Sequence, residues 1–383
     1  MLKPLIKYAG GKYDEYKEIK KYLPIKINNY YELFVGGGGV FFRLNDEKRV
    51  GGESFINDIS DSLIDFYESI TSDNFENELR KISKSWTFIK NFSKQFFGEF
   101  GGVFERLLFV DKNEEFITDY IKDYIVSNIK KMDFETHGFD VSEKIILSLN
   151  DKLKRFRKKE NIIDKDTVYK CITTCICQAF YFIIRDMYND WNNNGNKDKY
   201  TKEERSAQWM FIREFCFCSM FRFGKDGNFN VPYGGFGYNS KNFDKKIDNI
   251  FSKDVQNLFS RTNISIGDFE KTIEKWDLKE DDFLFLDPPY DSTFTDYDNN
   301  SFTREDHKRL ADCLKKCNCN WLMAIGYTDF IVELYKDYEI IPYDKTYMYQ
   351  ARGEYDGKHK KHIIIRNFKT KKQYEELGYI TLF

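Results

Sequence analysis

The sequence predicts an α/β fold in which one doubly wound sheet is split by a long, mostly helical insertion. Strand-like and helical runs alternate over residues 3–67, and the same alternation resumes at Asn263. Such alternation predicts a mostly parallel sheet covered by helices on both faces. Between these parts, residues 69–177 mix charged and aromatic side chains at helical spacing. A chain of 383 residues is also long enough for two domains.

The predicted strands are short apolar runs, and the predicted helices show a period of three to four residues. In chain order, the strands are residues 30–35, 55–58, 264–266, 283–286, 321–325 and 362–365. The clearest helical periods cover residues 77–82, 116–121, 304–317 and 328–335. A glycine-rich, irregular segment at residues 224–237 separates the insertion from the returning sheet.

Composition sets only weak limits on function. The 60 Lys and Arg residues against 62 Asp and Glu leave a formal charge of −2, so overall charge does not indicate a polyanionic partner. An aromatic content of 18% with only 6 prolines argues against disorder and predicts a large aromatic core.

Neither secretion nor membrane insertion is expected. The N-terminus lacks the apolar region of a signal peptide, and polar residues interrupt the longest apolar run, residues 171–184. The 8 cysteines show no Cys-x-x-Cys spacing. We therefore expect a soluble cytoplasmic protein with buried, reduced thiols and no metal.

Four glycines, Gly36 to Gly39, follow the first predicted strand. Glycine permits a sharp turn and a close approach of the backbone to a ligand. Neither a dinucleotide fingerprint nor a Walker A loop fits the spacing. Asp58 ends the second predicted strand, 20 residues after Gly38, where a carboxylate can bind ribose hydroxyls. Together these features favour a nucleoside-bearing cofactor without a pyrophosphate; a plain tight turn at the glycines is the alternative.

The most specific motif is Asp287-Pro288-Pro289-Tyr290, which follows an apolar strand. A carboxylate there lies at the carboxyl end of a parallel sheet, where α/β active sites form. The two prolines remove backbone donors, so the local carbonyls act only as acceptors. Acceptors beside an aromatic face suit a planar ring that carries an exocyclic amine.

With these motifs in place, the sequence resembles the Dam-type DNA adenine N6-methyltransferases. The matching motifs follow the family's order over residues 3–67 and 178–366. They are Lys7-Tyr8-Ala9-Gly10-Gly11-Lys12, the segments 31–39, 181–189 and 228–234, Gly267-Asp268-Phe269, Asp287-Pro288-Pro289-Tyr290, and Phe302 with His307.

The resemblance implies S-adenosylmethionine as the methyl donor and an adenine in double-stranded DNA as the acceptor. It also implies a Rossmann-like catalytic domain formed by residues 1–67 and 255–383. Residues 68–254 would then form an inserted helical target-recognition domain with a glycine-rich loop that contacts DNA.

Roles follow from the resemblance position by position. The catalytic matches are Asp287, Pro288 and Tyr290. The cofactor-binding matches are Tyr8, Ala9, Gly10, Lys12, Phe34, Gly36, Gly38, Asp58, Asp268, Phe269 and Asp287. The DNA-binding matches are Lys7, Arg185, Phe217, Arg222, Asn230, Pro232 and Tyr233.

The chain departs from the family pattern at several positions. Leu33 replaces a usual proline, and Tyr8 replaces a usual tryptophan. Cys218 and Phe223 replace asparagines near Arg222, so a target preference does not carry over from relatives. Residues 325–327 replace a usual Ser-Asn-His stretch near the active site.

Several alternatives stay open at this point. The acceptor could be cytosine N4, an adenine in RNA or a protein amide, although an aspartate as the first motif residue favours adenine. A catalytically silent DNA-binding relative is another alternative. A methylase, in turn, is either an orphan regulatory enzyme or one half of a restriction–modification pair with a cognate restriction endonuclease as its partner. Basic runs at residues 152–159 and 358–372 either contact phosphate or form solvated surface.

Overall fold

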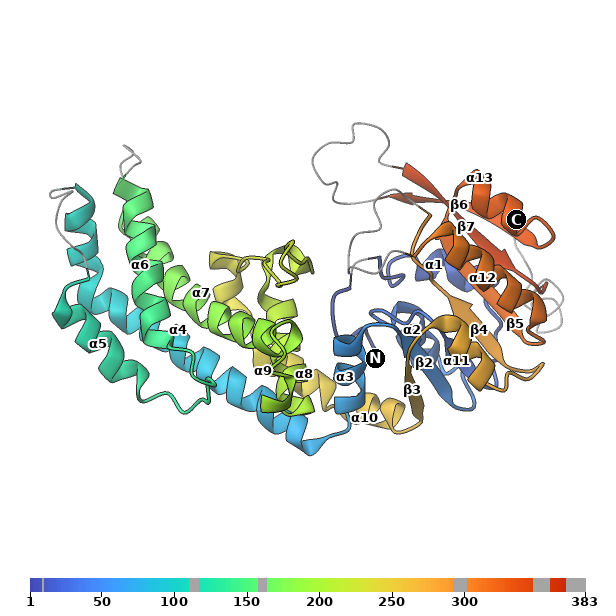
Figure 1. Ribbon diagram of the computed structural model, residues 1–383, viewed down its shortest axis with the longest axis horizontal. Helices are drawn as coiled ribbons and strands as arrows, with labels where there is room; N and C mark the ends of the chain where they lie inside the picture. Colours follow the sequence, from blue (N-terminus) through green and yellow to red (C-terminus); the bar gives the residue numbers. More distant parts are fainter. Residues whose placement is uncertain (9, 110–116, 158–163, 292–301, 347–358, 370–383) are drawn as a thin grey trace. The chain divides into compact units, whose positions relative to one another are not determined.

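A seven-stranded sheet forms the centre of the first of two units into which the chain folds (Figure 1). The strand order is β3-β2-β1-β4-β5-β7-β6. Strands β3, β2, β1, β4 and β5 pair in parallel, whereas β7 is antiparallel to both of its neighbours. The strands are β1 (Tyr30–Glu32), β2 (Ser54–Asp58), β3 (Thr262–Ile266), β4 (Phe283–Leu286), β5 (Asn320–Gly326), β6 (Glu339–Thr346) and β7 (His359–Arg366).

The computed structural model describes residues 1–8, 10–109, 117–157, 164–291, 302–346 and 359–369. The first unit comprises Met1–Glu68 with Ser252–Phe383, and the second comprises Ser69–Phe251. The predicted division of function between a catalytic and a target-recognition domain remains a prediction.

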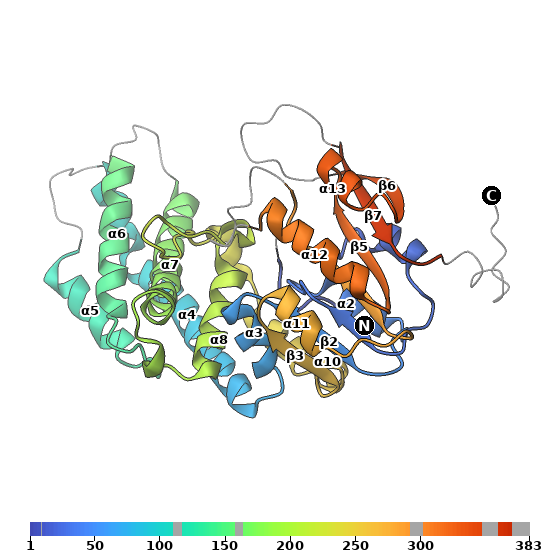
Figure 2. The same cartoon turned by 45° about the vertical axis from the view of Figure 1, so that its right-hand side comes forward.

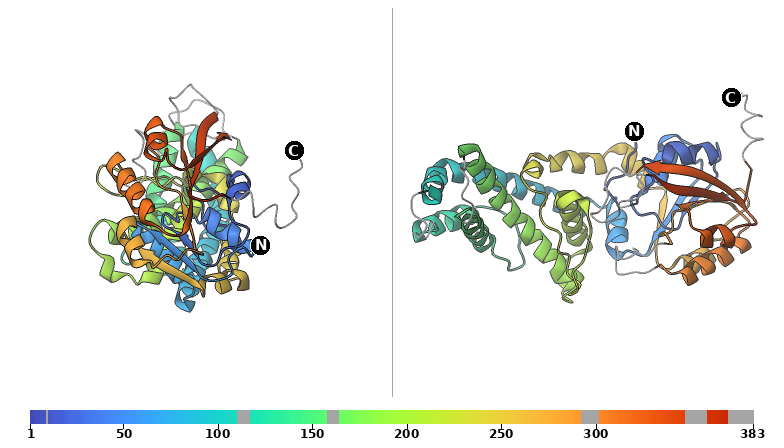
Figure 3. Two further views of the ribbon diagram at one scale, coloured as in Figure 1. Left: turned by 90° about the vertical axis from the view of Figure 1, so that its right-hand side faces the viewer. Right: turned by 90° about the horizontal axis from the view of Figure 1, so that it is seen from above.

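Helices cover both faces of the sheet, as a Rossmann-like fold requires. One face packs against α11 (Phe269–Lys275), α12 (Arg304–Lys316) and α13 (Asp329–Leu334), whose apolar side chains join a core with β4 and β5. Figure 2 shows these three helices in front of the strands. The right panel of Figure 3 shows them on one side of the sheet, with helices from the N-terminal part of the chain on the other.

The opposite face is built around aromatic rings that pack on one another. Phe41 of α2 lies 6.4 Å from Tyr30 of β1 and 5.9 Å from Phe259, measured between ring centroids. Tyr67 stacks on the same Phe259 at 5.7 Å. The helices that precede the insertion are α1 (Tyr16–Ile19), the 3-10 helix η1 (Lys20–Tyr22), α2 (Gly39–Asp46) and α3 (Asp61–Ser69). Helix α10 (Lys253–Phe259) follows the insertion.

The second unit is helical, and its core is aromatic. Trp86 is buried against Phe180, Phe211 and Phe215 at centroid distances of 6.2, 5.6 and 4.7 Å. The helices are α4 (Asp73–Phe109), α5 (Asp119–Ile129), α6 (Val141–Arg157), α7 (Lys165–Asn192), α8 (Lys202–Phe215) and α9 (Phe243–Ile250). Short 3-10 turns are η2 (Lys197–Lys199), η3 (Phe217–Ser219) and η4 (Phe236–Ser240).

Helix α7 is long and apolar enough to cross a membrane by length and composition alone. However, 61% of its most apolar window is buried inside the protein, where α7 packs against α4, α6 and α8. Such burial is typical of a helix in the core of a protein, so we describe α7 as a core helix.

The predicted α/β class is confirmed, with two local differences. Strand β6 was not predicted, because its mixture of charged residues with Pro342 lacks an apolar run. It lies at the sheet edge, the position that tolerates proline. The helical period expected at residues 116–121 begins later, since α5 starts at Asp119 after the extended residue Thr118; Phe116 lies outside the described residues.

A carboxyl group is buried in the centre of the sheet. Glu32 ends β1 with 2% of its surface exposed, and the Tyr30 hydroxyl donates a 2.7 Å hydrogen bond to its Oε2 atom. Burial, followed by the nearby carboxylates of Asp287 and Asp58, raises the pKa of Glu32 well above its ordinary value. The folded state therefore favours a protonated Glu32.

We predict that Glu32→Gln removes a pH-dependent loss of stability. Because folding raises the pKa of Glu32, the unfolded chain releases this proton at a lower pH than the folded chain does. Wild-type stability should therefore fall as pH rises above the ordinary glutamate pKa, by up to about 1.4 kcal/mol per pH unit from this group. The variant, which cannot ionise here, should lack this slope.

Urea unfolding between pH 5 and 8 measures the effect, with Glu280→Gln as the control at an exposed glutamate of the same unit. Parallel pH profiles for the wild type and Glu32→Gln would contradict the assignment.

Candidate active site

The strand order places two predicted motifs side by side. It reverses between β1 and β4, which are parallel neighbours. In open α/β sheets, ligands bind beyond the carboxyl ends of the strands at such a switch point. The glycine loop follows β1, and Asp287 follows β4. The two segments therefore flank the expected binding crevice.

Lys12 joins the N-terminal motif to the Asp-Pro-Pro-Tyr motif. Its side chain is 2% exposed, and its ammonium donates a hydrogen bond to Oδ1 of Asp287. A second hydrogen bond of 2.8 Å runs to the hydroxyl of Tyr290. The ammonium also lies 4.9 Å from the centroid of the Tyr290 ring. One buried cation thus contacts both the predicted catalytic carboxylate and the predicted stacking ring.

The glycine loop packs directly on the segment that carries Lys12. Gly38 has a φ of 68°, a left-handed conformation that glycine adopts without strain, and it caps α2. At Gly39, a side chain would place its Cβ only 2.7 Å from the backbone nitrogen of Tyr13. Here the glycines serve a turn and a close approach between two chain segments.

Asp58 fixes the start of this loop. Its Oδ2 accepts a 3.0 Å hydrogen bond from the backbone N–H of Gly36, and its Oδ1 accepts one of 3.1 Å from Ser60. The Tyr67 hydroxyl donates a 2.7 Å hydrogen bond to the carbonyl of Gly36. The carboxylate predicted to bind ribose therefore also holds the loop in place.

Three phenylalanines gather near these loops. Phe34 lies 5.8 Å from Phe269 and 5.7 Å from Phe302, and the last two rings are 5.7 Å apart. His307 packs edge-on against Phe302 at 4.7 Å, and burial lowers its pKa to about 4. The imidazole of His307 is therefore neutral and packs on Phe302.

Asp268 and Phe269 are held by Arg309 of α12. The Arg309 guanidinium donates a 2.9 Å hydrogen bond to Oδ1 of Asp268 and lies 4.8 Å from the Phe269 ring centroid. It also binds Glu270 at 2.7 Å. Asp268 caps the start of α11 by accepting from the backbone N–H of Glu270.

The rest of the predicted catalytic motif is anchored as well. Pro288 is buried, and Tyr290 is partly buried. Asp291, the next residue, binds Arg304 at 2.9 Å and accepts a 3.0 Å hydrogen bond from the Thr328 hydroxyl. Both ends of the motif are therefore fixed to neighbouring elements.

Most of the predicted DNA contacts lie in the helical unit. Arg222 and Asn230 are exposed, and the backbone N–H of Asn230 donates a 3.3 Å hydrogen bond to the carbonyl of Arg222. Phe217 is 46% exposed, and its backbone N–H donates to the carbonyl of the exposed Pro232 at 2.8 Å. The segment that carries Phe217 and Arg222 thus lies next to the segment that carries Asn230 and Pro232.

Two other predicted contacts differ in their surroundings. Arg185 is partly buried on α7, with its guanidinium 4.4 Å from the Phe182 ring. Tyr233 is only 5% exposed, packs on Trp86 and donates a 2.7 Å hydrogen bond to Asn239. Its burial does not favour the predicted DNA contact, and the side chain instead stabilises the loop.

The remaining predicted residues are placed as follows. In the first unit, Lys7 and Gly10 are exposed and Tyr8 is partly buried. Ala9 lies outside the described residues, as do parts of both basic runs. Cys218 is exposed, contrary to the expectation that the cysteines are buried, because residues 218 and 219 form a left-handed turn at the surface.

Sequence reasoning missed several polar residues around the site: Glu15, Glu32, Arg309 and His362. His362 lies within the basic run at residues 358–372, yet it is only 1% exposed. Glu15, Arg309 and His362 have partners in distant parts of the chain, so no local sequence signal marks them. The partner of Glu32 is Tyr30, only two residues away, but the burial of the pair depends on the neighbouring strands.

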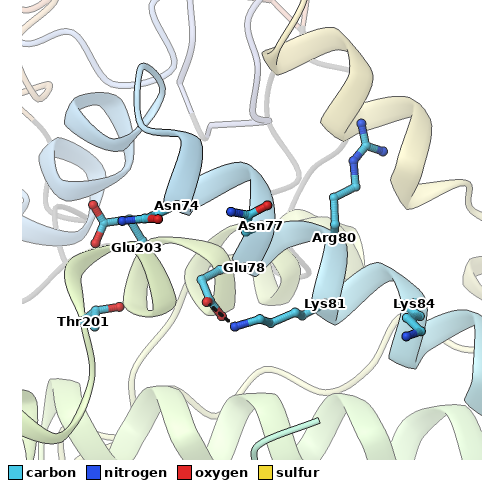
Figure 4. Close-up of a pocket in the computed structure, with 8 residues that line it drawn as sticks. All are labelled: Asn74, Asn77, Glu78, Arg80, Lys81, Lys84, Thr201 and Glu203. Carbon is cyan, nitrogen blue, oxygen red and sulfur yellow. Dashed lines mark hydrogen bonds and ion pairs between the residues drawn. The ribbon is translucent and has the colours of Figure 1, made fainter. Parts of the chain in front are cut away.

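A hollow in the helical unit is lined by eight residues, none of which is an aromatic residue that could stack on a base (Figure 4). Its lining mixes acids, amides and bases, and Glu78 and Lys81 pair at 2.7 Å. Arg80 extends away from them in Figure 4 and binds Asp248 at 2.7 Å. Among the described residues, no group of three or more His, Cys, Asp or Glu side chains is placed to hold a metal ion.

Comparison with known proteins identifies the family. A profile of the D12 class N6 adenine-specific DNA methyltransferase family matches residues 8–130 and 124–349. The chain is 26% identical over 369 residues to the Type II methyltransferase M.CviBI of Paramecium bursaria Chlorella virus NC1A, covering 96% of this chain and 100% of that protein.

Two further relatives have similar names and coverage. The Type II methyltransferase M1.LlaDCHI of Lactococcus lactis subsp. cremoris is 25% identical over 375 residues, which cover 96% of each chain. The Type II methyltransferase M.MjaIII of Methanocaldococcus jannaschii is 26% identical over 367 residues, covering 92% of this chain and 94% of that protein. With the fold and the paired motifs, these matches show that the chain belongs to the D12 class N6 adenine-specific DNA methyltransferase family.

Proposed function

We propose that this DNA adenine methyltransferase transfers a methyl group from S-adenosylmethionine to N6 of an adenine flipped out of double-stranded DNA. One observation carries the proposal: Lys12 binds both Asp287 and Tyr290 at the switch point of the sheet, beside the glycine loop. These side chains supply an acceptor and an aromatic face at one point along the carboxyl edge of the sheet.

The residues beside the switch point fit S-adenosylmethionine. An acidic side chain at the end of β2, Asp58, suits ribose hydroxyls, and Phe269 with Asp268 suits an adenine ring and its amine. The Gly36 N–H is already bonded to Asp58, so it is not aimed at a pyrophosphate. We assign Tyr8, Ala9, Gly10, Lys12, Phe34, Gly36 and Gly38 to the same site. When bound, S-adenosylmethionine supplies an electrophilic methyl group on a positively charged sulfur.

The catalytic motif prepares the acceptor amine. The N6 nitrogen of adenine is a weak nucleophile, because its lone pair is conjugated with the ring. Asp287 and the Pro288 carbonyl accept the two N6 hydrogens, which favours a pyramidal nitrogen with a localised lone pair. Tyr290 stacks on the ring and fixes its direction. Catalysis on this account is mainly positioning, together with stabilisation of developing charge.

Base flipping makes the amine accessible. Extruding an adenine costs a few kcal/mol of pairing and stacking, which contacts to the rest of the duplex must offset. The exposed ring of Phe217 suits insertion into the base stack, and the nearby cation of Arg222 suits a phosphate or a base edge. We therefore assign residues 68–254 to target recognition, with Lys7, Arg185, Asn230 and Pro232 as further contacts.

We propose a cellular role from the names of the relatives. The three relatives described above are named Type II methyltransferases, so we propose that this chain protects DNA against a cognate restriction endonuclease. Because its substrate is DNA, we also propose a cytoplasmic location.

Sequencing that detects modified bases tests the function and reveals the target. DNA from cells that express the protein should carry N6-methyladenine at one recurring short sequence. Asp287→Ala should lose this signal, whereas Asp281→Ala, a change at an exposed aspartate six residues earlier, should keep it. N4-methylcytosine at the recurring sequence, or an unchanged signal with Asp287→Ala, would contradict the proposal.

Calorimetry tests the cofactor site separately. Asp58→Asn keeps one acceptor for the Gly36 N–H but loses the charge that we assign to the ribose hydroxyls. The Kd for S-adenosylmethionine should rise roughly tenfold or more, since a hydrogen bond to a charged group contributes about 1.5–3 kcal/mol. Asp281→Asn should bind like the wild type. Equal affinity of Asp58→Asn and the wild type would remove Asp58 from the site.

A further inference from the structure

A buried carboxylate lies behind the catalytic motif. Glu15 is 7% exposed and follows Lys12 by three residues, at the start of α1. The hydroxyl of Tyr343 on β6 donates a 2.8 Å hydrogen bond to Oε2 of Glu15. The Nδ1 atom of His362 on β7 lies 3.3 Å from the same oxygen. Glu15 therefore connects the N-terminal motif to the two antiparallel strands of the sheet.

His362 carries this connection to Tyr290. The imidazole is 1% exposed, and its ring meets the Tyr290 ring edge to face, with centroids 5.3 Å apart and planes at 88°. On its other side, the imidazole lies 5.6 Å from the Tyr343 ring. The ring plane of Tyr290 is thus constrained by an imidazole that Glu15 and Tyr343 constrain in turn.

The chemistry of this group favours a fixed arrangement. A buried carboxylate is costly unless it is hydrogen-bonded, so Glu15 needs its donors in place. Burial, and then the Glu15 charge, raises the pKa of Tyr343, which keeps its hydroxyl protonated as a donor. Edge-to-face packing of aromatic rings is also directional. A substitution of Glu15 or Tyr343 should therefore change the orientation of the Tyr290 ring.

We propose that Glu15, Tyr343 and His362 are positioning residues that set the orientation of the Tyr290 ring for stacking on the target adenine. This inference rests on the proposed role of Tyr290. Lys12 fixes the hydroxyl end of Tyr290, and His362 fixes the tilt of its ring. Both constraints are needed, because a small misorientation of a reacting group can cost roughly a hundredfold in rate.

The test compares two tyrosines that each bond to a glutamate. Tyr343→Phe removes the hydroxyl that binds Glu15, and Tyr16→Phe removes one that binds Glu47 at 3.0 Å in the same unit. Single-turnover methylation of the target duplex should slow roughly tenfold in Tyr343→Phe, with unchanged affinity for S-adenosylmethionine. Tyr16→Phe should match the wild type.

A spectroscopic reading separates positioning from a loss of stability. With 2-aminopurine in place of the target adenine, stacking on Tyr290 quenches the emission of the flipped base. Tyr343→Phe and Glu15→Gln should each brighten the bound base, whereas Tyr16→Phe should not. Wild-type rate and emission in both Tyr343→Phe and Glu15→Gln would overturn the inference.

Tyr290→Ala distinguishes failure of the network from failure of the proposed function. In one outcome, Tyr290→Ala slows methylation and brightens the base, while Tyr343→Phe and Glu15→Gln change neither the rate nor the emission. That result refutes the positioning role of Glu15, Tyr343 and His362 and leaves the stacking role of Tyr290 intact. If Tyr290→Ala itself changes neither reading, the stacking role on which the inference rests is wrong.

Discussion

The proposed active site depends on the contacts that the buried ammonium of Lys12 makes with Asp287 and Tyr290. This ammonium joins a loop near the N-terminus to residues that lie 275 and 278 positions later in the chain. A charge that is almost fully shielded from water must be paired. Removing one partner of a buried ion pair typically lowers the free energy of unfolding by about 3–5 kcal/mol. Lys12 and Asp287 therefore hold one another in position, and Tyr290 is held with them.

Other features of the first unit follow from this requirement. For Lys12 to reach Asp287, its segment must pass close to the loop after β1, and Gly39 leaves no room there for a side chain. The same loop is held from the other side by Asp58 and Tyr67. Residues assigned to the cofactor and residues assigned to the base are thus parts of one packed arrangement. This arrangement suits a reaction whose rate depends on geometry.

The sequence predicts those parts of the site that rest on local signals. The apolar run before Asp287 predicts that this carboxylate lies at the carboxyl end of a strand, and the position of the glycines predicts the same for their loop. That the two strands are neighbours at the switch point is known only from the strand order. Strand β6 was missed because its charged residues and Pro342 leave no apolar run. The DNA contact of Tyr233 stays a prediction, although its ring packs on Trp86 in an aromatic core. Glu15 and His362 were missed because their pairing spans 347 residues, a separation that no periodicity reveals.

A double-mutant cycle tests the central claim most directly. Single-turnover methylation rates at saturating S-adenosylmethionine are measured for the wild type, Lys12→Met, Asp287→Asn and the double variant, with circular dichroism to check that each is folded. If Lys12 acts by holding Asp287, the double variant should be no slower than Asp287→Asn alone, because the two residues work as one unit. Rate losses that multiply in the double variant would show that the two residues act independently, and would contradict this account.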